Sequence, residues 1–290
     1  MKRYFLSSIV YFALLTPSSC GIERPNPVPR PPSPSPSPEL PAPKPVPPET
    51  PKPPLVESCV TGKTYQVESK PYRGFFYKPK ADCLAPLIVG NNGTGAPSLF
   101  YARVGRALAA KGFAVIWPEN PQTGSGRSCM AALEYGFKQP FILPMHYGIT
   151  GHSQGGSATV VCGGLAKQKW PDYRAALLPD EAACGMSRPD WKRIVNQVTA
   201  PTLFFAGSRD TVVPERWVRQ CYDQVRTNKA LIIGVGASHM NSSSWMQELA
   251  PLFFTAALFD HLESYEELNE LDSRKWKWRF EFEQIDRQGD

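Results

Sequence analysis

Between residues 65 and 262, short apolar runs alternate with segments of helical periodicity. The apolar runs are four to six residues long and rich in Val, Ile, Leu and Phe, a pattern typical of strands buried on both faces of a parallel sheet. The predicted strands are 65–69, 74–78, 87–90, 113–117, 145–150, 173–178, 202–206 and 230–235. The predicted helices are 98–111, 128–137, 156–167, 215–226 and 245–261. This alternation predicts an α/β fold with a mainly parallel sheet of about eight strands and helices on both faces.

The first 54 residues have a different composition. Residues 1–20 carry Lys2 and Arg3, then an apolar stretch, then small residues up to Cys20, which is typical of a signal peptide. We therefore expect an exported protein, either secreted or held in a bacterial cell envelope. Two outcomes stay open: lipidation of Cys20, which would tether the protein to a membrane, and simple cleavage nearby.

Residues 21–54 form a predicted spacer, because sixteen prolines lie between residues 25 and 54. Such a segment cannot bury a core and favours an extended polyproline-II conformation. Residues 55–262 are the predicted catalytic domain, and residues 263–290 a C-terminal extension. In that extension, a strand over 275–283 would place four aromatic side chains on one face, either packed on the domain or offered to a partner: Trp276, Trp278, Phe280 and Phe282.

Charge and cysteine content narrow the function further. The net charge is +6, but outside the segment 275–283 basic residues do not cluster with aromatics, so we expect no nucleic-acid partner. Six cysteines remain beyond residue 54, and their even number in an exported chain favours disulfides over buried free thiols. The predicted pairs are Cys59–Cys83, Cys129–Cys162 and Cys184–Cys221. No spacing of Cys and His indicates a metal site, and we expect no metal or organic cofactor.

One motif carries the chemistry. Residues 151–155 read Gly-His-Ser-Gln-Gly between a predicted strand and a predicted helix, which is the context of a nucleophile elbow centred on Ser153. The tight turn strains the serine backbone and requires small neighbours, which Gly151, Gly155 and Gly156 supply. A serine hydroxyl is a weak nucleophile, so a base and an orienting acid are needed as well.

Position selects the base and the acid. Of the four histidines, His239 alone lies in a loop directly after a late strand; His152 is inside the elbow, His146 is at the far end of its strand, and His261 is late in a helix. Asp210 follows the strand 202–206, and the order Ser153, Asp210, His239 matches the order of triads in α/β-hydrolases.

Asp180 is the second candidate for the acid, although we interpret it as a helix cap or an exposed loop carboxylate. The oxyanion of the tetrahedral intermediate needs two N–H donors, which we assign to the amides of Gln154 and Thr94.

With these residues placed, residues 57 to about 262 resemble exported α/β-hydrolases that include cutinase-like poly(ethylene terephthalate) hydrolases and dienelactone-hydrolase-like esterases. The matching segments are 92–95 (NGTG), 106–116 (RALAAKGFAVI), 151–156, 210–214 (DTVVP) and 236–239 (GASH). The resemblance implies a triad of Ser153, Asp210 and His239, with Thr94 and Gln154 in the oxyanion hole. The chain differs from polyester hydrolases at Thr94, at Gln154 and in 178–182, where those enzymes carry aromatic residues or Met. Polyester hydrolysis is therefore not the main expectation.

The sequence thus predicts an exported, monomeric serine hydrolase that cleaves small or polymeric carboxylic esters through an acyl-enzyme. The segment 179–200 is too short for a large lid domain. Two alternatives remain: the same triad acting on amides, thioesters or polyesters, and a non-catalytic hydrolase-like domain displayed for binding.

Overall fold

The computed structural model describes residues 66–67, 74–78, 83–120, 124–240, 242–269 and 278–282. All of them belong to the compact unit Pro51–Asp290. The predicted signal peptide, the Pro-rich spacer and Cys59 lie outside the described residues, as does most of the C-terminal extension.

The described residues form one nine-stranded sheet with the order β1-β2-β4-β3-β5-β6-β7-β8-β9. The six strands from β4 to β8 run parallel, while β1 and β2 at one edge and β9 at the other are antiparallel. The strands are β1 (Gln66–Val67), β2 (Gly74–Lys78), β3 (Ala85–Asn91), β4 (Ala114–Pro118), β5 (Ile142–His152), β6 (Arg174–Asp180), β7 (Thr202–Gly207), β8 (Lys229–Gly234) and β9 (Trp278–Phe282).

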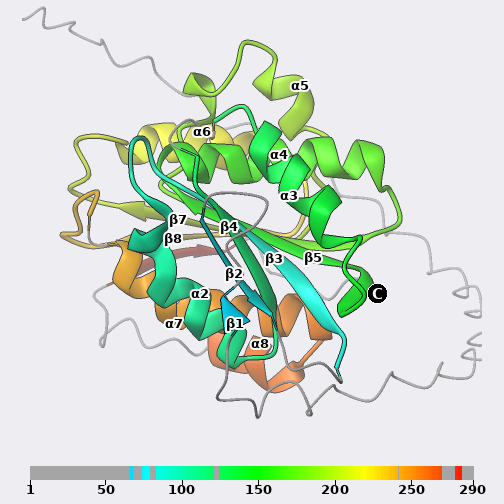
Figure 1. Cartoon of the computed structure of the whole chain (residues 1–290). Helices are drawn as coiled ribbons and strands as arrows, with labels where there is room; N and C mark the ends of the chain where they lie inside the picture. The colour runs from blue at the N-terminus through cyan, green and yellow to red at the C-terminus, as the bar shows by residue number, and fades with distance from the viewer. Residues whose placement is uncertain are drawn as a thin grey trace, which may run out of the picture. The chain divides into compact units, whose positions relative to one another are not determined.

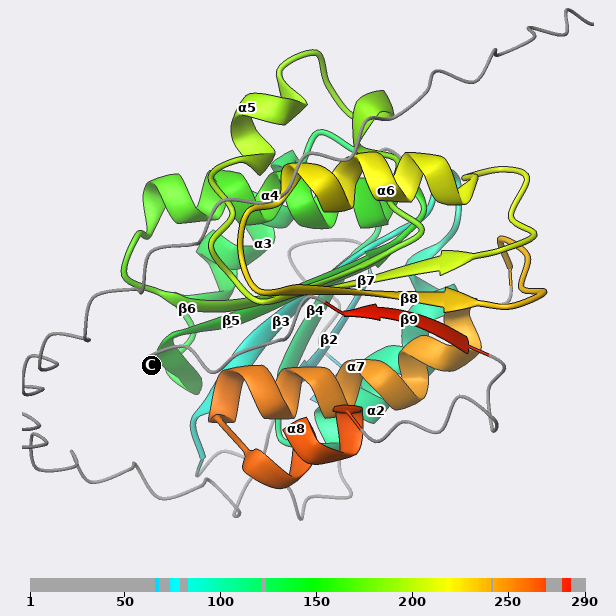
Figure 2. The same ribbon diagram turned by 180° about the vertical axis from the view of Figure 1, so that it is seen from behind.

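Helices cover both faces of this sheet. Figures 1 and 2 show α3, α4, α5 and α6 on one face and α2, α7 and α8 on the other. The α-helices are α2 (Ala102–Ala110), α3 (Arg127–Gly136), α4 (Gln154–Lys169), α5 (Trp191–Val195), α6 (Glu215–Gln224), α7 (Ser242–Phe259) and α8 (Leu262–Asn269). Two short 3-10 helices complete the elements, η1 (Ser98–Tyr101) and η2 (Cys184–Met186). None of the helices in the described ranges has the length and hydrophobicity needed to cross a bilayer.

The sheet separates two apolar cores. One lies under α3, α4 and α6 and includes Leu87, Ile149 and Leu177; the other lies under α2 and α7 and includes Ile88 and Trp117. Neighbouring residues such as Leu87 and Ile88 face opposite cores, because side chains alternate along a strand. Both are fully buried, which explains why the central strands read as continuous apolar runs.

The predicted mainly parallel sheet with helices on both faces is confirmed. The helix predicted over 98–111 begins as the 3-10 helix η1, and the structure adds α5 and α8, which the sequence analysis did not identify. Only η2 and α5 lie between β6 and β7, so the prediction that no large lid domain is inserted there is also confirmed. At the sheet edge, β9 pairs with β8, within the predicted strand 275–283.

Two of the three predicted disulfides are confirmed. Cys129–Cys162 joins α3 to α4 on either side of β5, and Cys184–Cys221 joins η2 to α6. Cys83 is also disulfide-bonded, but its predicted partner Cys59 lies outside the described residues.

Candidate active site

The turn between β5 and α4 has the backbone of a nucleophile elbow. Ser153 stands between the two elements with φ 59° and ψ −118°, a region that residues other than glycine rarely occupy. The turn is closed by the Ser153 amide, which donates to the Asp180 carbonyl at 2.9 Å. The strain at Ser153 is of the kind found at functional sites.

The glycines around Ser153 permit close backbone approaches. A β-carbon at Gly155 would lie 2.2 Å from the Asn91 carbonyl oxygen, and one at Gly156 would lie 2.2 Å from the Asp180 carbonyl oxygen. Both distances are far below van der Waals contact, so the start of α4 packs against the ends of β3 and β6 only because these residues have no side chain.

Three side chains from distant parts of the chain meet at this turn. His239 Nε2 lies 3.0 Å from Ser153 Oγ, and His239 Nδ1 lies 2.7 Å from Asp210 Oδ2. These are the distances expected for a nucleophile, its base and an orienting acid. The fold thus brings together the three residues selected from the sequence.

Hydrogen bonds fix the loops that carry the acid and the base. The other oxygen of Asp210, Oδ1, accepts the backbone N–H groups of Val212 and Val213 at 2.8 and 2.9 Å. The Arg209 amide donates to the Ala237 carbonyl at 2.8 Å and ties the loop after β7 to the loop after β8. The triad carboxylate is therefore oriented by its own backbone, independently of His239.

A second carboxylate, which the sequence analysis did not identify, also contacts the base. Glu181 Oε2 lies 2.8 Å from His239 Nδ1, and the Glu181 side chain is completely buried. Glu181 directly follows β6 and has a φ of 51°. The sequence signal for Glu181 was its place just after the predicted strand 173–178, where Asp180 was the candidate considered.

The interpretation of Asp180 as a helix cap or exposed carboxylate was wrong. Asp180 is the last residue of β6 and is fully buried. The residue after the strand, Glu181, is the one whose side chain reaches His239.

His152, the variable residue within the elbow, is part of the same cluster. Its Nε2 lies 2.9 Å from Glu181 Oε2 and 3.0 Å from the His239 carbonyl oxygen, so this nitrogen carries a proton and donates. Its Nδ1 lies 3.3 Å from the Tyr101 hydroxyl, which in turn accepts the Gly93 amide at 2.9 Å. A chain of hydrogen bonds therefore runs from the loop after β3 to His239.

Burial and charge shift the pKa values of the cluster in opposite directions. Burial lowers the pKa of His152, which keeps its ring neutral, and raises the pKa of Glu181 to about 7. Burial also acts to lower the pKa of His239, but contact with Glu181 and Asp210 outweighs it and raises that pKa to about 9. The site thus favours a positive charge on His239, the charge that a general base acquires when it takes a proton.

The two residues assigned to the oxyanion hole lie on either side of the elbow. Gln154 is the first residue of α4, and Thr94 is exposed in the loop after β3. The Gly93 amide is engaged by Tyr101, whereas the Thr94 amide makes no hydrogen bond within the described residues. Buried Asn92 holds this loop, because it accepts from Trp117 Nε1 at 2.7 Å and donates to the Pro118 carbonyl at 3.2 Å.

The cluster also contains a set of side chains of a kind that binds metals. His152, Glu181 and His239 place their ligand atoms within 4.8 Å of one another. They are joined by hydrogen bonds of 2.8 and 2.9 Å, whereas ligands of a tetrahedral zinc ion lie about 3.3 Å apart. The three side chains would have to separate to admit such an ion, and their hydrogen bonds favour a proton network.

Comparison with known families gives one match. Residues 117–240 match the family model of serine hydrolases described as Serine hydrolase (FSH1), which is 124 of the 290 residues. The matched segment contains the elbow, Glu181, Asp210 and His239, and ends just after the last of them. A search among curated proteins found no match.

The match supports a serine hydrolase and does not single out the cutinase-like or dienelactone-hydrolase-like branch, which remains a prediction. The chain therefore has the α/β-hydrolase fold, and its segment from Trp117 to Met240 is similar to serine hydrolases.

Proposed function

We propose that the protein hydrolyses carboxylic esters through an acyl-enzyme formed on Ser153. The observation that carries this proposal is the continuous contact from Ser153 Oγ to His239 Nε2 and from His239 Nδ1 to Asp210, at 3.0 and 2.7 Å. A complete and correctly spaced set of nucleophile, base and acid favours catalysis over a binding role alone.

The two steps follow from these contacts. In the neutral ring of His239 the single proton is held on Nδ1 by a carboxylate, so Nε2 has a free lone pair and accepts the hydroxyl proton as Ser153 attacks the acyl carbon. His239 then returns the proton to the leaving alcohol, and the same histidine activates the water that releases the acid. The Gln154 and Thr94 amides donate to the oxyanion in both steps; loss of one such donor typically costs about 10²–10³ in rate.

Apolar side chains near the site favour an ester with an apolar group. Phe100, Val212 and Met240 are exposed, and each is close in sequence to a residue of the site: Phe100 precedes Tyr101, Val212 donates to Asp210, and Met240 follows His239. Exposed apolar side chains on the loops that carry a site are of the kind that binds an apolar substrate group. Because no large lid lies between β6 and β7, a bulky or polymeric ester has access as well.

Labelling with a fluorophosphonate tests the catalytic assignment. We expect covalent labelling of the wild type that is lost in Ser153→Ala, and loss of p-nitrophenyl ester hydrolysis of about 10⁶ in that variant. Ser264→Ala is the matched control, because Ser264 lies on α8 and its hydroxyl contacts His261, which is not a residue of the site. A folded wild type that resists labelling would support the alternative of a non-catalytic binding module.

Rates on a series of p-nitrophenyl esters from acetate to palmitate define the substrate class. Preference for short chains would indicate an acetyl esterase, and equal use of long chains would indicate lipids or polymers. Parallel assays with an anilide and a thioester of the same acyl group test whether the triad acts mainly on those bonds.

We also propose that the protein is exported, on the basis of residues 1–20 and the number of cysteines. Fractionation of cells expressing the full chain tests export, and labelled palmitate tests lipidation, with Cys20→Ser as the control. Retention of the full-length chain inside the cell would contradict this proposal.

A further inference from the structure

The structure places two carboxylates on one nitrogen of the catalytic base. Asp210 Oδ2 and Glu181 Oε2 lie 2.7 and 2.8 Å from His239 Nδ1. A triad needs only one acid to keep the Nδ1 proton in place. A triad with one acid therefore leaves the second acid without a role.

Each acid has contacts of its own. Asp210 is oriented by the Val212 and Val213 amides, whereas Glu181 accepts the Nε2 proton of His152 at 2.9 Å. The two arise from different strand ends, Glu181 after β6 and Asp210 after β7. The two carboxyl groups also interact with each other, but removal of one leaves these separate contacts of the other in place.

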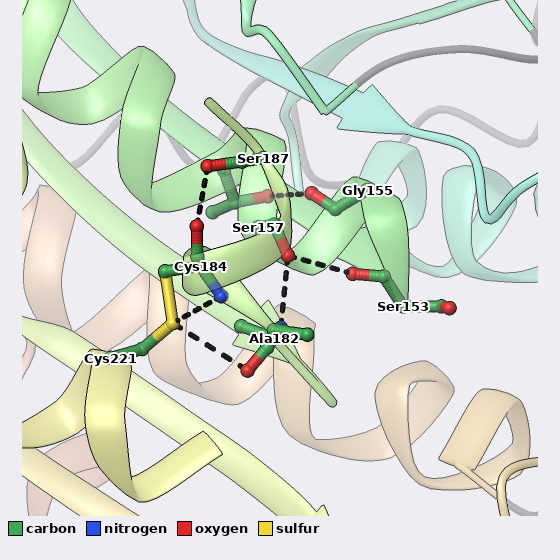
Figure 3. The surroundings of a disulfide bond; sticks show 9 residues. Ser153, Gly155, Ser157, Ala182, Cys184, Ser187 and Cys221 are labelled. Atoms are coloured by element: carbon green, nitrogen blue, oxygen red, sulfur yellow. Dashed lines mark hydrogen bonds between the residues drawn. A yellow bond between two sulfur atoms is a disulfide. The ribbon is translucent and has the colours of Figure 1, made fainter. Parts of the chain in front are cut away.

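The backbone at Glu181 is held in an uncommon conformation. Its φ of 51° lies in the left-handed region, which disfavours residues other than glycine, asparagine and aspartate. The Glu181 amide donates to the Phe205 carbonyl at 2.9 Å, and the Ala183 amide donates to Ser157 Oγ at 2.9 Å. The disulfide Cys184–Cys221 then anchors the same segment to α6 (Figure 3).

Stability alone does not explain a carboxylate at this position. Glu181 is fully buried, and its Oε1 has no hydrogen-bond partner among the described residues. Burying a carboxyl group with one oxygen unpaired is unfavourable. A strained backbone and an incompletely paired acid, both adjacent to a catalytic histidine, are typical of a functional residue.

We propose that Glu181 is a second acid of the catalytic site, a positioning residue that holds the Nδ1 proton of His239 in parallel with Asp210. The inference rests on the proposed function, because it assumes that His239 is the base. His152 donates to the same oxygen of Glu181, Oε2, and stays neutral, with its single ring proton on Nε2. No proton leaves Nδ1 during the reaction; Glu181 and Asp210 jointly stabilise the imidazolium that forms when Nε2 accepts the serine proton.

The test compares Asp210→Asn, Glu181→Gln and the double variant by kcat/KM on p-nitrophenyl acetate. In a triad with a single acid, the Asp-to-Asn change costs about 10⁴ in rate because the histidine takes the wrong tautomer. With Glu181 present, we expect each single variant to lose about 10- to 100-fold and the double variant about 10⁴-fold. Glu134→Gln is the control, because Glu134 lies on α3 with a half-exposed side chain facing Lys169.

The pH dependence of kcat/KM distinguishes a positioning role of Glu181 from a purely structural one, because a structural role would leave it unchanged. The groups that face His239 are Ser153 from α4, Asp210 after β7, Glu181 after β6 and the His152 ring, 4.6 Å away at the end of β5. Buried Asp180 at the end of β6 acts in turn on His152. With one carboxylate removed, the imidazolium is less stable and the pKa of His239 falls. The acid limb of kcat/KM in Glu181→Gln should therefore move to lower pH.

Two results would overturn the inference. One is a loss of about 10⁴ in Asp210→Asn alone, with no further loss in the double variant. The other is a Glu181→Gln variant whose kcat/KM and whose midpoint of the acid limb equal those of the control Glu134→Gln. If Asp210→Asn does not fold, the rate and pH profile of Glu181→Gln decide. If Glu181→Gln does not fold, the size of the loss in Asp210→Asn decides. Failure of the proposed function would be distinct, because wild type would then resist fluorophosphonate or Ser153→Ala would keep its activity.

Discussion

The raised pKa of the catalytic base predicts a steep alkaline activity profile. His239 must be neutral to accept the serine proton, and the two carboxylates raise its pKa from 6.5 to about 9 against the effect of burial. At pH 7 only about 1% of the free enzyme then carries a neutral base. We expect kcat/KM to rise about tenfold per pH unit below pH 8 and to level off above pH 9.

The assay is kcat/KM on p-nitrophenyl acetate between pH 6 and 10, with Ser153→Ala measured at each pH to subtract spontaneous ester hydrolysis. The rate of fluorophosphonate labelling should follow the same curve, because it also needs the neutral histidine. A profile that is already flat above pH 7.5, in a protein that remains folded across the range, would refute the reasoning. It would mean that the two contacts to Nδ1 do not favour the imidazolium.

Three further predictions concern the support of the site. Gly155→Ala should abolish most activity and destabilise the fold by about 1–3 kcal/mol, because the new methyl group would lie 2.2 Å from a backbone oxygen; Gly185→Ala, with its nearest neighbour at 3.6 Å, should be neutral in both assays. Replacing Lys229 by Met should cost about 1–3 kcal/mol in urea unfolding, because its buried Nζ donates to the Tyr222 and Val225 carbonyls at the end of α6; an unchanged midpoint would contradict this. Replacing Cys184 and Cys221 by Ser should lower the free energy of unfolding by about 2–4 kcal/mol. Because this bond is then absent, reductant should destabilise the variant less than the wild type in urea unfolding, and an equal effect on both would contradict this.

Much of the fold was predictable because its signals are local. Apolar runs of strand length indicate strands that are covered by helices on both faces. Gly112, with φ 88°, follows the end of α2, where the helical periodicity of the sequence also stops. The elbow was predictable for the same reason. The Gly-x-Ser-x-Gly motif lies within one strand, one turn and one helix, although the close approaches that exclude side chains at Gly155 and Gly156 are to Asn91 of β3 and Asp180 of β6.

The candidate triad could be selected before the structure because few residues qualify. Position after a strand left His239 as the single suitable histidine, and the loop after β7 offered Asp210 in the right order. The structure brings these side chains together, while their catalytic roles remain predictions for the assays above. Two disulfides were also predictable, since Cys129 and Cys162 flank the elbow strand.

The sequence by itself therefore determined the order of strands and helices, the strained turn at Ser153 and the few residues suited to act with it. Only the tertiary structure decided that Glu181 and His152 belong to the same cluster. That outcome depends on the register of β5 with β6, which pairs His152 with Asp180, and of β6 with β7, which pairs Asp180 with Phe205. In buried strands that are apolar on both faces, a shift in register leaves the hydrophobic pattern almost unchanged, so the sequence cannot reveal which side chains meet at the strand ends.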